Sequence, residues 1–313
     1  MAIARAPTVF VSGGSRGIGL AIALKLAKEK GANVTIAAKT ATPHPKLPGT
    51  IYTAAEAIEK AGGTALPLVV DIRDAGAVQD AVEQTASKFG GLDILVNNAS
   101  AISLTDSQET SVKTFDLMSS INARGTFLAS KFAIPHLFTS ASRGRNPHIL
   151  TLAPPLEGNL NPSTLGPCTA YAIAKLGMSL ATVGLAGELH GKVGVNALWP
   201  LTYISTEAIR FLIGSDGRDT KSRHPSIVAD AALAMLEQDG RTFSGNFEID
   251  ELCLRRLRGY TTSDLLRYSP TVAEAATAPT TADPFANLHE DLFIPEWVRE
   301  EVARLRAEDA KGS

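Results

Sequence analysis

The sequence has few cysteines and no long apolar run. Its 313 residues include two cysteines, Cys168 and Cys253, which are too few for a disulfide framework and lack the spacing of metal ligands. We therefore predict two reduced thiols and no metal site. No apolar run reaches the roughly 18 residues that a membrane-spanning helix needs, so no membrane span is predicted.

The chain also lacks an excess of charge of either sign. It has 30 Lys and Arg against 32 Asp and Glu, and a formal net charge of −2, which argues against nucleic acid or an anionic membrane as a partner. Met1–Phe10 runs straight into a strand-like segment and leaves no room for a signal peptide, and the last residues are not a peroxisomal tripeptide. The expectation is an intracellular, cytoplasmic protein.

Short β-branched runs alternate with longer helical patterns along most of the chain. The runs predict strands at Thr8–Ser12, Asn33–Ala38, Leu66–Asp71, Leu92–Asn98, His148–Ala153, Gly194–Trp199 and Gly245–Asp250. Helices are predicted at Ile18–Lys30, Ala75–Phe89, Lys113–Phe138, Ala170–Leu189 and Ser226–Leu236. Near-continuously apolar strands between helices are typical of a doubly wound parallel α/β sheet of the Rossmann type, here over residues 1–255.

The composition changes after about Arg255. Tyr260–Leu288 is rich in Thr, Ala and Pro without a sustained period, and we expect it to be loose. Pro295–Asp309 then predicts one amphipathic helix, so residues 256–313 form a C-terminal extension. We expect this helix to pack on the main domain or a second subunit, rather than to act as a lid, through its apolar positions Trp297, Val298, Val302 and Leu305.

Four glycines crowd the turn between the first strand and the first helix, at Gly13, Gly14, Gly17 and Gly19. Glycines let a backbone approach a pyrophosphate closely, and the helix that follows offers free N–H groups and a positive dipole end. A glycine cluster alone is weak evidence, but its place after a strand and before a helix favours dinucleotide binding over a merely structural turn.

The end of the second strand indicates which dinucleotide is bound. NAD-binding folds place Asp or Glu there to bind the ribose hydroxyls, whereas this chain has Ala37–Thr40 without an acid. Lys39, together with Arg16 from the glycine turn, would attract a 2′-phosphate. We therefore predict NADP(H); the alternative is that Lys39 is an ordinary solvated surface charge.

Further motifs follow in order along the chain. Asp71 ends the third strand, Asn97–Ser100 follows the fourth, and Asn122 lies in the long central helix. Tyr171 and Lys175 are one helical turn apart and so share a face. Together with the glycine turn, these motifs resemble the short-chain dehydrogenase/reductase family over about residues 6–252.

The resemblance implies a role for each motif. Tyr171 would be the general acid in reduction and the base in oxidation. Lys175 would bind the nicotinamide ribose and lower the pKa of the Tyr171 phenol, and Asn122 would hold a water in the proton relay. The alternative for Tyr171 is an ordinary tyrosine packed in a core. Family members form dimers or tetramers, so a homo-oligomer is expected.

The resemblance also implies a cofactor site. Asp71 would accept a hydrogen bond from the adenine amino group, and Pro200 and Ile204–Thr206 would flank the carboxamide. The implied cofactor-binding residues are Ser12, Gly13, Ser15, Arg16, Gly17, Ile18, Gly19, Lys39, Asp71, Asn98, Ala99, Tyr171, Lys175, Pro200, Ile204 and Thr206.

One position departs from the family pattern. The family supplies a serine hydroxyl to the substrate oxygen at the end of the fifth strand, where this chain has Ala153 followed by two prolines. Thr151 lies on the same face but further back, and Ser163 or Thr164 would have to reach in from the next loop. The chain is therefore a reductase without that serine, a reductase in which a loop hydroxyl or the substrate itself supplies the donor, or an NADP(H)-binding protein with little or no redox turnover.

The predicted substrate pocket comprises the segment after Ala153, Ser100–Leu104 and Ala197–Gly214. The last of these is apolar through Trp199, Tyr203, Phe211 and Leu212, which indicates a hydrophobic carbonyl or alcohol as substrate. The alternative is that these residues pack a helix onto the sheet.

Overall fold

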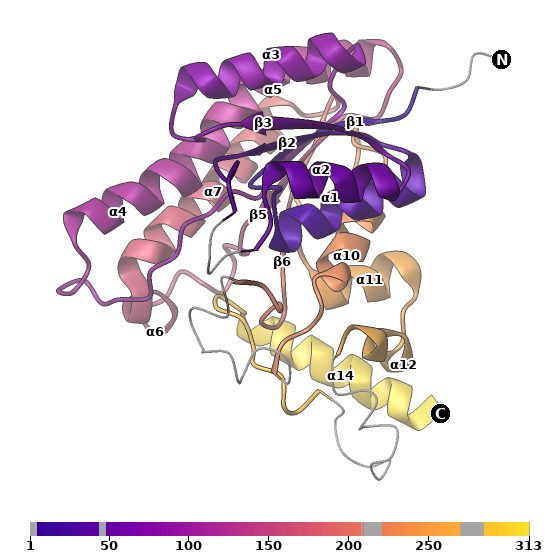
Figure 1. Cartoon of the computed structure of the whole chain (residues 1–313). Coiled ribbons are helices and arrows are strands. Elements are labelled where there is room, and N and C mark those ends of the chain that lie inside the picture. Colours follow the sequence, from indigo (N-terminus) through magenta and orange to yellow (C-terminus); the bar gives the residue numbers. More distant parts are fainter. Residues whose placement is uncertain (1–4, 44–47, 208, 210–220, 270–284, 313) are drawn as a thin grey trace.

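A parallel sheet forms the centre of the computed structural model, which describes residues 5–43, 48–207, 209, 221–269 and 285–312 (Figure 1). Its strand order is β3-β2-β1-β4-β5-β6-β7. The order reverses between β1 and β4, and ligands of such sheets bind beyond the strand ends at this switch point. The bounds are β1 Thr8–Ser12, β2 Asn33–Ala38, β3 Thr64–Val69, β4 Ile94–Asn97, β5 His148–Leu152, β6 Gly194–Trp199 and β7 Phe247–Ile249.

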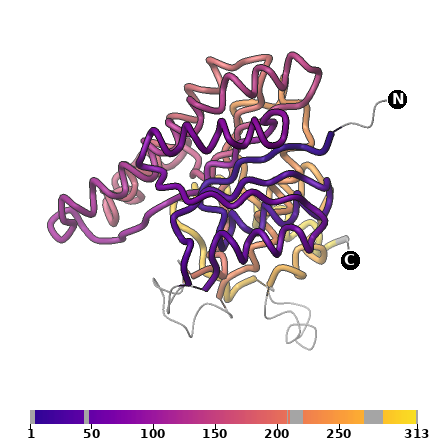
Figure 2. The backbone as a smooth tube through the Cα atoms, turned by 45° about the horizontal axis from the view of Figure 1, so that its top comes forward, coloured from indigo at the N-terminus to yellow at the C-terminus, as the bar shows by residue number. Residues whose placement is uncertain are grey.

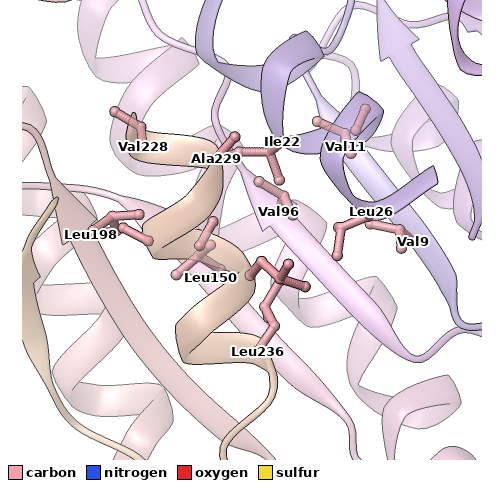
Figure 3. Packing of buried hydrophobic residues seen from close by; sticks show 14 of the residues in the cluster. Val9, Val11, Ile22, Leu26, Val96, Leu150, Leu198, Val228, Ala229 and Leu236 are labelled. Atoms are coloured by element: carbon pink, nitrogen blue, oxygen red, sulfur yellow. The ribbon is translucent and has the colours of Figure 1, made fainter. Parts of the chain in front are cut away.

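Helices cover both faces of the sheet, which confirms the doubly wound prediction. One apolar core lies under α1 (Gly17–Lys30), α2 (Ile51–Lys60) and α10 (Ser226–Leu236). Figure 3 shows α1 and α10 packing their side chains onto β1, β4, β5 and β6. The core of the other face lies under α3 (Ala75–Phe89), α5 (Gly125–Ser142) and α7 (Thr169–Glu188).

The long central helix is interrupted, contrary to the prediction of one helix over Lys113–Phe138. The structure has α4 (Val112–Ser119), a π-helical turn (Ser120–Arg124) and then α5, which follow one another along the magenta rod of Figure 2. A π turn inserts one residue without ending the helix, and such turns are frequent at functional sites. An apolar pattern averaged over the segment does not reveal one inserted residue.

The chain after Arg255 is more ordered than expected in the parts that the structure describes. Asp250–Arg258 is a helix, α11, and α12 (Thr262–Leu265) follows it within the segment expected to be loose. Leu265 and Tyr268 are buried in the main core, which explains the order. Residues 270–284 of that segment lie outside the described residues.

The predicted C-terminal helix is present as α14 (Glu296–Gly312), drawn in yellow along the lower edge of Figure 1. Val298 and Val302 are buried with Trp199 and Phe293, so α14 packs on the main domain. Trp297, which we also expected to pack, is 41% exposed.

One helical stretch of the described residues, Pro162–Glu188, is long and apolar enough to cross a membrane. However, 61% of its apolar window is buried in the protein. That burial is typical of a core helix, and this stretch includes α7.

Candidate active site

A cavity of about 430 Å³ lies at the carboxyl ends of the strands, around the switch point. It runs from the glycine turn to residues of the C-terminal extension. Most residues predicted from the sequence to bind a cofactor line it: Gly13, Ser15, Arg16, Gly17, Ile18, Lys39, Asp71, Asn98, Ala99, Tyr171, Lys175, Pro200, Ile204 and Thr206.

The glycine turn has the geometry of a phosphate cradle. Gly13 and Gly17 have φ values of +67° and +57°, which other residues rarely adopt. A Cβ atom on Gly19 would stand 2.5 Å from the Asn98 Nδ2. No side chain caps the start of α1, and its first turn carries no acidic residue. Its free N–H groups and positive dipole end therefore suit a pyrophosphate.

Ser12 supports the cradle from behind rather than lining the cavity. Its Oγ accepts hydrogen bonds from the backbone N–H groups of Asn98 and Ala99, both at 3.1 Å. The Asn98 side chain donates in turn to the carbonyl oxygens of Ser12 and Gly13, both at 3.0 Å. These bonds tie the ends of β1 and β4 together under the glycine turn.

Basic side chains lie at the end of β2. Lys39, whose side chain is 59% exposed, places its Nζ 3.4 Å from the Asp71 Oδ2, and Arg16 donates to the Thr40 hydroxyl at 2.8 Å. Arg73 hydrogen-bonds the Asp71 carboxylate and holds its pKa far below the usual range, with Lys39 adding to the effect. The prediction missed Arg73, although "VVDIRD" places it two residues after Asp71.

Tyr171 and Lys175 project from one face of α7 into the cavity, and both are buried. Lys175 donates from Nζ to the Leu152 carbonyl oxygen at 2.6 Å, with the Trp199 ring 4.8 Å away. Burial lowers the pKa of the Lys175 ammonium to about 7, although Asp291 opposes this change.

The expected decrease in the pKa of Tyr171 is not found. Burial raises the pKa of the Tyr171 phenol far above its usual range, and the negative charge of Asp291 adds to the increase. The Ser100 hydroxyl beside it acts in the opposite direction. In this arrangement Lys175 donates to the Leu152 carbonyl oxygen rather than to the Tyr171 hydroxyl.

Asn122 lies in the π-helical turn, fully buried and outside the cavity wall. Its Oδ1 accepts from the Ala101 N–H at 2.8 Å, and its Nδ2 donates to the Ala101 carbonyl oxygen at 3.0 Å. The side chain thus fixes the loop after β4. Its role in holding a water stays a prediction.

The structure clarifies the position where the family serine is missing. Ala153 is buried against Met178 and Ala197, in a small cluster apart from the cavity. Of the residues of β5, Leu152 lines the cavity and Thr151 does not. The hydroxyl of Ser163 donates to the Asn161 Oδ1 at 2.7 Å.

Ser163 and Thr164 do not line the cavity, so neither fulfils the expectation of a loop hydroxyl that reaches in. The segment after Ala153 does not line it either. Of the other predicted pocket residues, Ser100, Ile102, Trp199 and Tyr203 do line it. Phe211 and Leu212 lie outside the described residues.

The sequence prediction missed Asp291 and Leu292, which bring the C-terminal extension into the cavity wall. The Phe293 ring lies 5.9 Å from that of Tyr171 and 6.3 Å from that of Trp199. No motif in the sequence pointed to this contact. The extension comes after the core motifs along the chain and contains no recognisable motif itself.

Neither cysteine belongs to this site. Cys168 and Cys253 are both free and buried. Within the described ranges, no group of three His, Cys, Asp or Glu side chains is placed to hold a metal ion.

Comparisons with known proteins show the family of the chain. A family model for short chain dehydrogenase matches residues 7–212. Hydroxysteroid dehydrogenase-like protein 2 of Danio rerio is 57% identical over 250 residues, which cover 80% of this chain and 58% of that protein. The human protein of that name is 54% identical over 248 residues, covering 79% and 57%. The chain thus spans less than two thirds of the length of these relatives.

Two solved structures resemble nearly the whole chain. A structure from Xanthomonas campestris named as a dehydrogenase is 48% identical, covers 93% of this chain and 99% of its own, and superposes with a TM-score of 0.82. A short chain dehydrogenase from Mycobacterium thermoresistibile is 47% identical, with coverage of 93% and 95% and a TM-score of 0.79. This coverage extends past residue 255 into the C-terminal extension.

Proposed function

The chain belongs to the short-chain dehydrogenase/reductase family, and from this premise we propose that it is an NADP(H)-dependent oxidoreductase of a hydrophobic carbonyl/alcohol pair. One observation carries the proposal: a single cavity joins the phosphate cradle at Gly13–Gly19 to the Tyr171–Lys175 pair. A protein that only held a dinucleotide would have no need of a buried tyrosine and lysine at the far end of that cavity.

The choice of NADP(H) rests on the end of β2. Lys39 and Arg16, which donates to the Thr40 hydroxyl, line the cavity there, where an NAD-binding fold would have a carboxylate. A 2′-phosphate would gain charge-assisted hydrogen bonds from both. Asp71, from the end of the next strand, would face the adenine.

When bound, the reduced nicotinamide supplies a hydride to the carbonyl carbon of the substrate. Tyr171 then transfers its phenolic proton to the carbonyl oxygen, which becomes the alcohol hydroxyl. Lys175, in its charged form, stabilises the remaining phenolate. Asn122 holds the loop after β4 in place, and Pro200, Ile204 and Thr206, which line the cavity, would border the nicotinamide.

The substrate is a hydrophobic carbonyl compound or alcohol. The cavity wall near Tyr171 contains Ile102, Trp199 and Leu292, which would bury apolar substrate surface at roughly 25 cal/mol per Å². Among these apolar residues, a few polar groups such as Tyr171 would orient the reacting carbonyl.

A second candidate function is NADP(H) binding with little or no redox turnover, in a regulatory or other non-redox role. Its support is that β5 presents Leu152 to the cavity and no hydroxyl group. In other enzymes, loss of one such donor lowers the rate by a factor on the order of 10²–10³, which is severe but does not abolish catalysis.

NADPH consumption over a panel of hydrophobic aldehydes, ketones and diketones separates the two functions. We expect wild type to consume NADPH and the rate of Tyr171→Phe to be lower by on the order of 10²–10⁴. The surface substitution Tyr52→Phe should leave the rate as in wild type. NADPH binding without consumption, and equal behaviour of wild type and Tyr171→Phe, would favour the second function.

We also propose a cytoplasmic homo-oligomer. Apolar side chains stay exposed on the outer faces of α5 and α7: Phe127 at 52%, Ile173 at 53%, Leu180 at 61% and Val183 at 48%. A second copy would cover them. Light scattering should give a multiple of 32.9 kDa for wild type and a smaller particle for Leu180→Glu.

A further inference from the structure

The C-terminal extension carries one carboxyl group, that of Asp291, into the catalytic end of the cavity. Main-chain bonds fix its place. The Asp291 N–H donates to the Leu201 carbonyl oxygen at 3.0 Å. The carbonyl oxygen of the next residue, Leu292, accepts from the Trp199 Nε1 at 2.7 Å. The backbone is therefore held on both sides of the carboxyl group.

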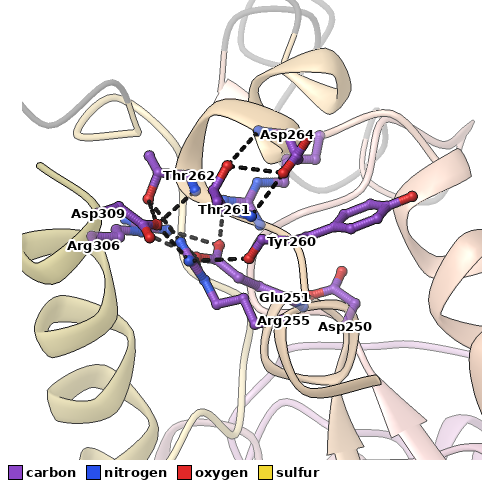
Figure 4. Close-up of polar contacts among 10 residues, drawn as sticks. Asp250, Glu251, Arg255, Tyr260, Thr261, Thr262, Asp264, Arg306 and Asp309 are labelled. Atoms are coloured by element: carbon purple, nitrogen blue, oxygen red, sulfur yellow. Dashed lines mark hydrogen bonds and ion pairs between the residues drawn. The ribbon is translucent and has the colours of Figure 1, made fainter. Parts of the chain in front are cut away.

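The rest of the extension is anchored to the same body, as Figure 4 shows. Arg306 on α14 pairs with the buried Glu251 of α11 at 2.9 Å. Asp309 accepts from the Arg255 Nη1 at 2.7 Å. These pairs join α14 to α11, so Asp291 belongs to a fixed wall of the site.

Asp291 acts on both members of the catalytic pair. In its ionised form Asp291 raises the pKa of Tyr171, second to burial, and opposes the effect of burial on the pKa of Lys175. It also raises the pKa of Tyr203, again second to burial. Asp291 lines the same cavity as Tyr171, Lys175 and Tyr203, so its carboxyl group shares with them the space that a substrate carbonyl would enter.

The carboxyl group can act as a donor at neutral pH. Burial raises the pKa of Asp291 to about 8, with Asp250 and Glu290 adding to the increase, while the Leu292 N–H and Lys175 oppose it. One oxygen, Oδ1, accepts from the Leu292 N–H at 2.7 Å. The other oxygen has no hydrogen-bond partner in the part of the chain that the structure describes. A protonated carboxyl group donates one hydrogen bond, and a carboxylic acid kept neutral by its surroundings can stabilise an oxyanion.

We propose that Asp291 is a catalytic residue that donates a hydrogen bond to the carbonyl oxygen of the substrate beside Tyr171. This contact would replace the one that β5, with Leu152 at the cavity and Ala153 buried elsewhere, does not make. As hydride reaches the carbonyl carbon, negative charge grows on the oxygen, and two donors, Tyr171 and Asp291, face it. The inference rests on the proposed function, since it assumes a carbonyl substrate at Tyr171.

Steady-state reduction of the best carbonyl substrate from the panel tests the role. Asp291→Ala should lower kcat by on the order of 10²–10³. Asp291→Asn keeps a donor, and we expect it to stay within about tenfold of wild type. Wild-type kcat should fall as pH rises through about 8, because a carboxylate cannot donate. Lys175, whose pKa is about 7, loses its proton in both proteins, so the test is the additional fall near pH 8, which the Asn variant should lack. Glu300→Gln, which removes an exposed carboxylate on α14, is the matched control.

Infrared spectra of the complex with NADP+ and 2-decanone give a readout that needs no turnover. We expect the ketone C=O band to move to lower frequency in wild type and Asp291→Asn, and less in Asp291→Ala. A ketone band that is the same in all three proteins, or an Asp291→Ala variant as active as wild type, would overturn the proposal. A shifted band without any NADPH consumption would instead sink the proposed function and leave the contact standing.

Discussion

Gly13 lies so close to Ala99 that a Cβ atom on Gly13 would stand 2.9 Å from the Ala99 Cα. Gly13 also has a positive φ, so a side chain there would be strained and would push the cradle away from β4. We predict that Gly13→Ala weakens NADPH binding at least tenfold, measured by quenching of protein fluorescence or by calorimetry.

The matched control for that substitution is Gly184→Ala on α7, where an added Cβ meets nothing within 4 Å. Alanine in a helix interior is favoured over glycine by roughly 0.5–1 kcal/mol. Gly184→Ala should therefore bind NADPH as wild type does and be slightly more stable. Equal binding by both variants would mean that the turn is not the phosphate site.

Lys39 is predicted to select the phosphorylated cofactor. Lys39→Glu places a carboxylate at the end of β2, which would repel a 2′-phosphate and could accept from ribose hydroxyls. We expect the preference for NADPH over NADH, as a ratio of kcat/KM values, to fall by on the order of 10²-fold, because a repulsive charge replaces an attractive one. Lys28→Glu makes the same charge change on an exposed part of α1 and should leave the ratio unchanged.

The sheet and most of the cavity wall around the glycine turn were predictable from the sequence. The bounds of β1, β2 and β6 agree with the prediction, because buried parallel strands are continuous apolar runs that end at turn residues. The glycine turn and the Tyr171–Lys175 pair are each recognised from the spacing of a few residues within one short segment. The strand order of the fold then places both at the same cavity.

The parts that were missed depend on contacts that no local pattern records. The helix α2 was not predicted, since its capping box pairs Thr50 with Thr53 rather than with the usual Glu or Gln. The place of Asp291 depends on an isolated antiparallel bridge between Thr202 and Glu290. A one-residue bridge leaves no periodicity in the sequence.

A buried ion cluster should make the C-terminal extension important for stability. Glu251 is fully buried and pairs with Arg223, Arg255 and Arg306 at 2.6, 3.1 and 2.9 Å. Glu251→Gln would leave the buried Arg223 without its counter-charge. Removal of one partner of a buried pair costs about 3–5 kcal/mol, and we expect a loss of that size in the free energy of unfolding by urea.

An exposed pair provides the contrast. Arg304 pairs with Glu301 at 2.7 Å on the outer face of α14, and exposed pairs contribute about 0–1 kcal/mol. Arg304→Ala should therefore change stability little. If Glu251→Gln and Arg304→Ala had the same small effect, the buried cluster would not hold the extension.

His148 should make the protein sensitive to acid. Burial lowers the pKa of the His148 imidazole to about 4, although its contact with the Gln238 carbonyl and the charge of Asp239 oppose this change. In the unfolded chain the pKa of the imidazole is about 6.5, the value of an unperturbed histidine. Between pH 6.5 and 4 the unfolded state thus binds a proton that the folded state excludes, so stability falls as the pH falls through this window, by at most about 1.4 kcal/mol per pH unit.

His148→Gln removes this titration while keeping a group that can donate to the Gln238 carbonyl oxygen, which lies 3.2 Å from the His148 Nε2. We expect the free energy of unfolding to depend less steeply on pH between 6.5 and 4 in this variant than in wild type. Below that window the two curves should run parallel, because protonation of carboxylates then determines how stability depends on pH. Glu251 is one of them: Arg223 and Arg306 lower its pKa to about 2 against the effect of burial. His190→Gln controls for the loss of an exposed imidazole. Urea unfolding at half-unit pH steps decides the matter: if wild type and His148→Gln show the same slope over the whole range, His148 is not the group whose protonation destabilises the fold.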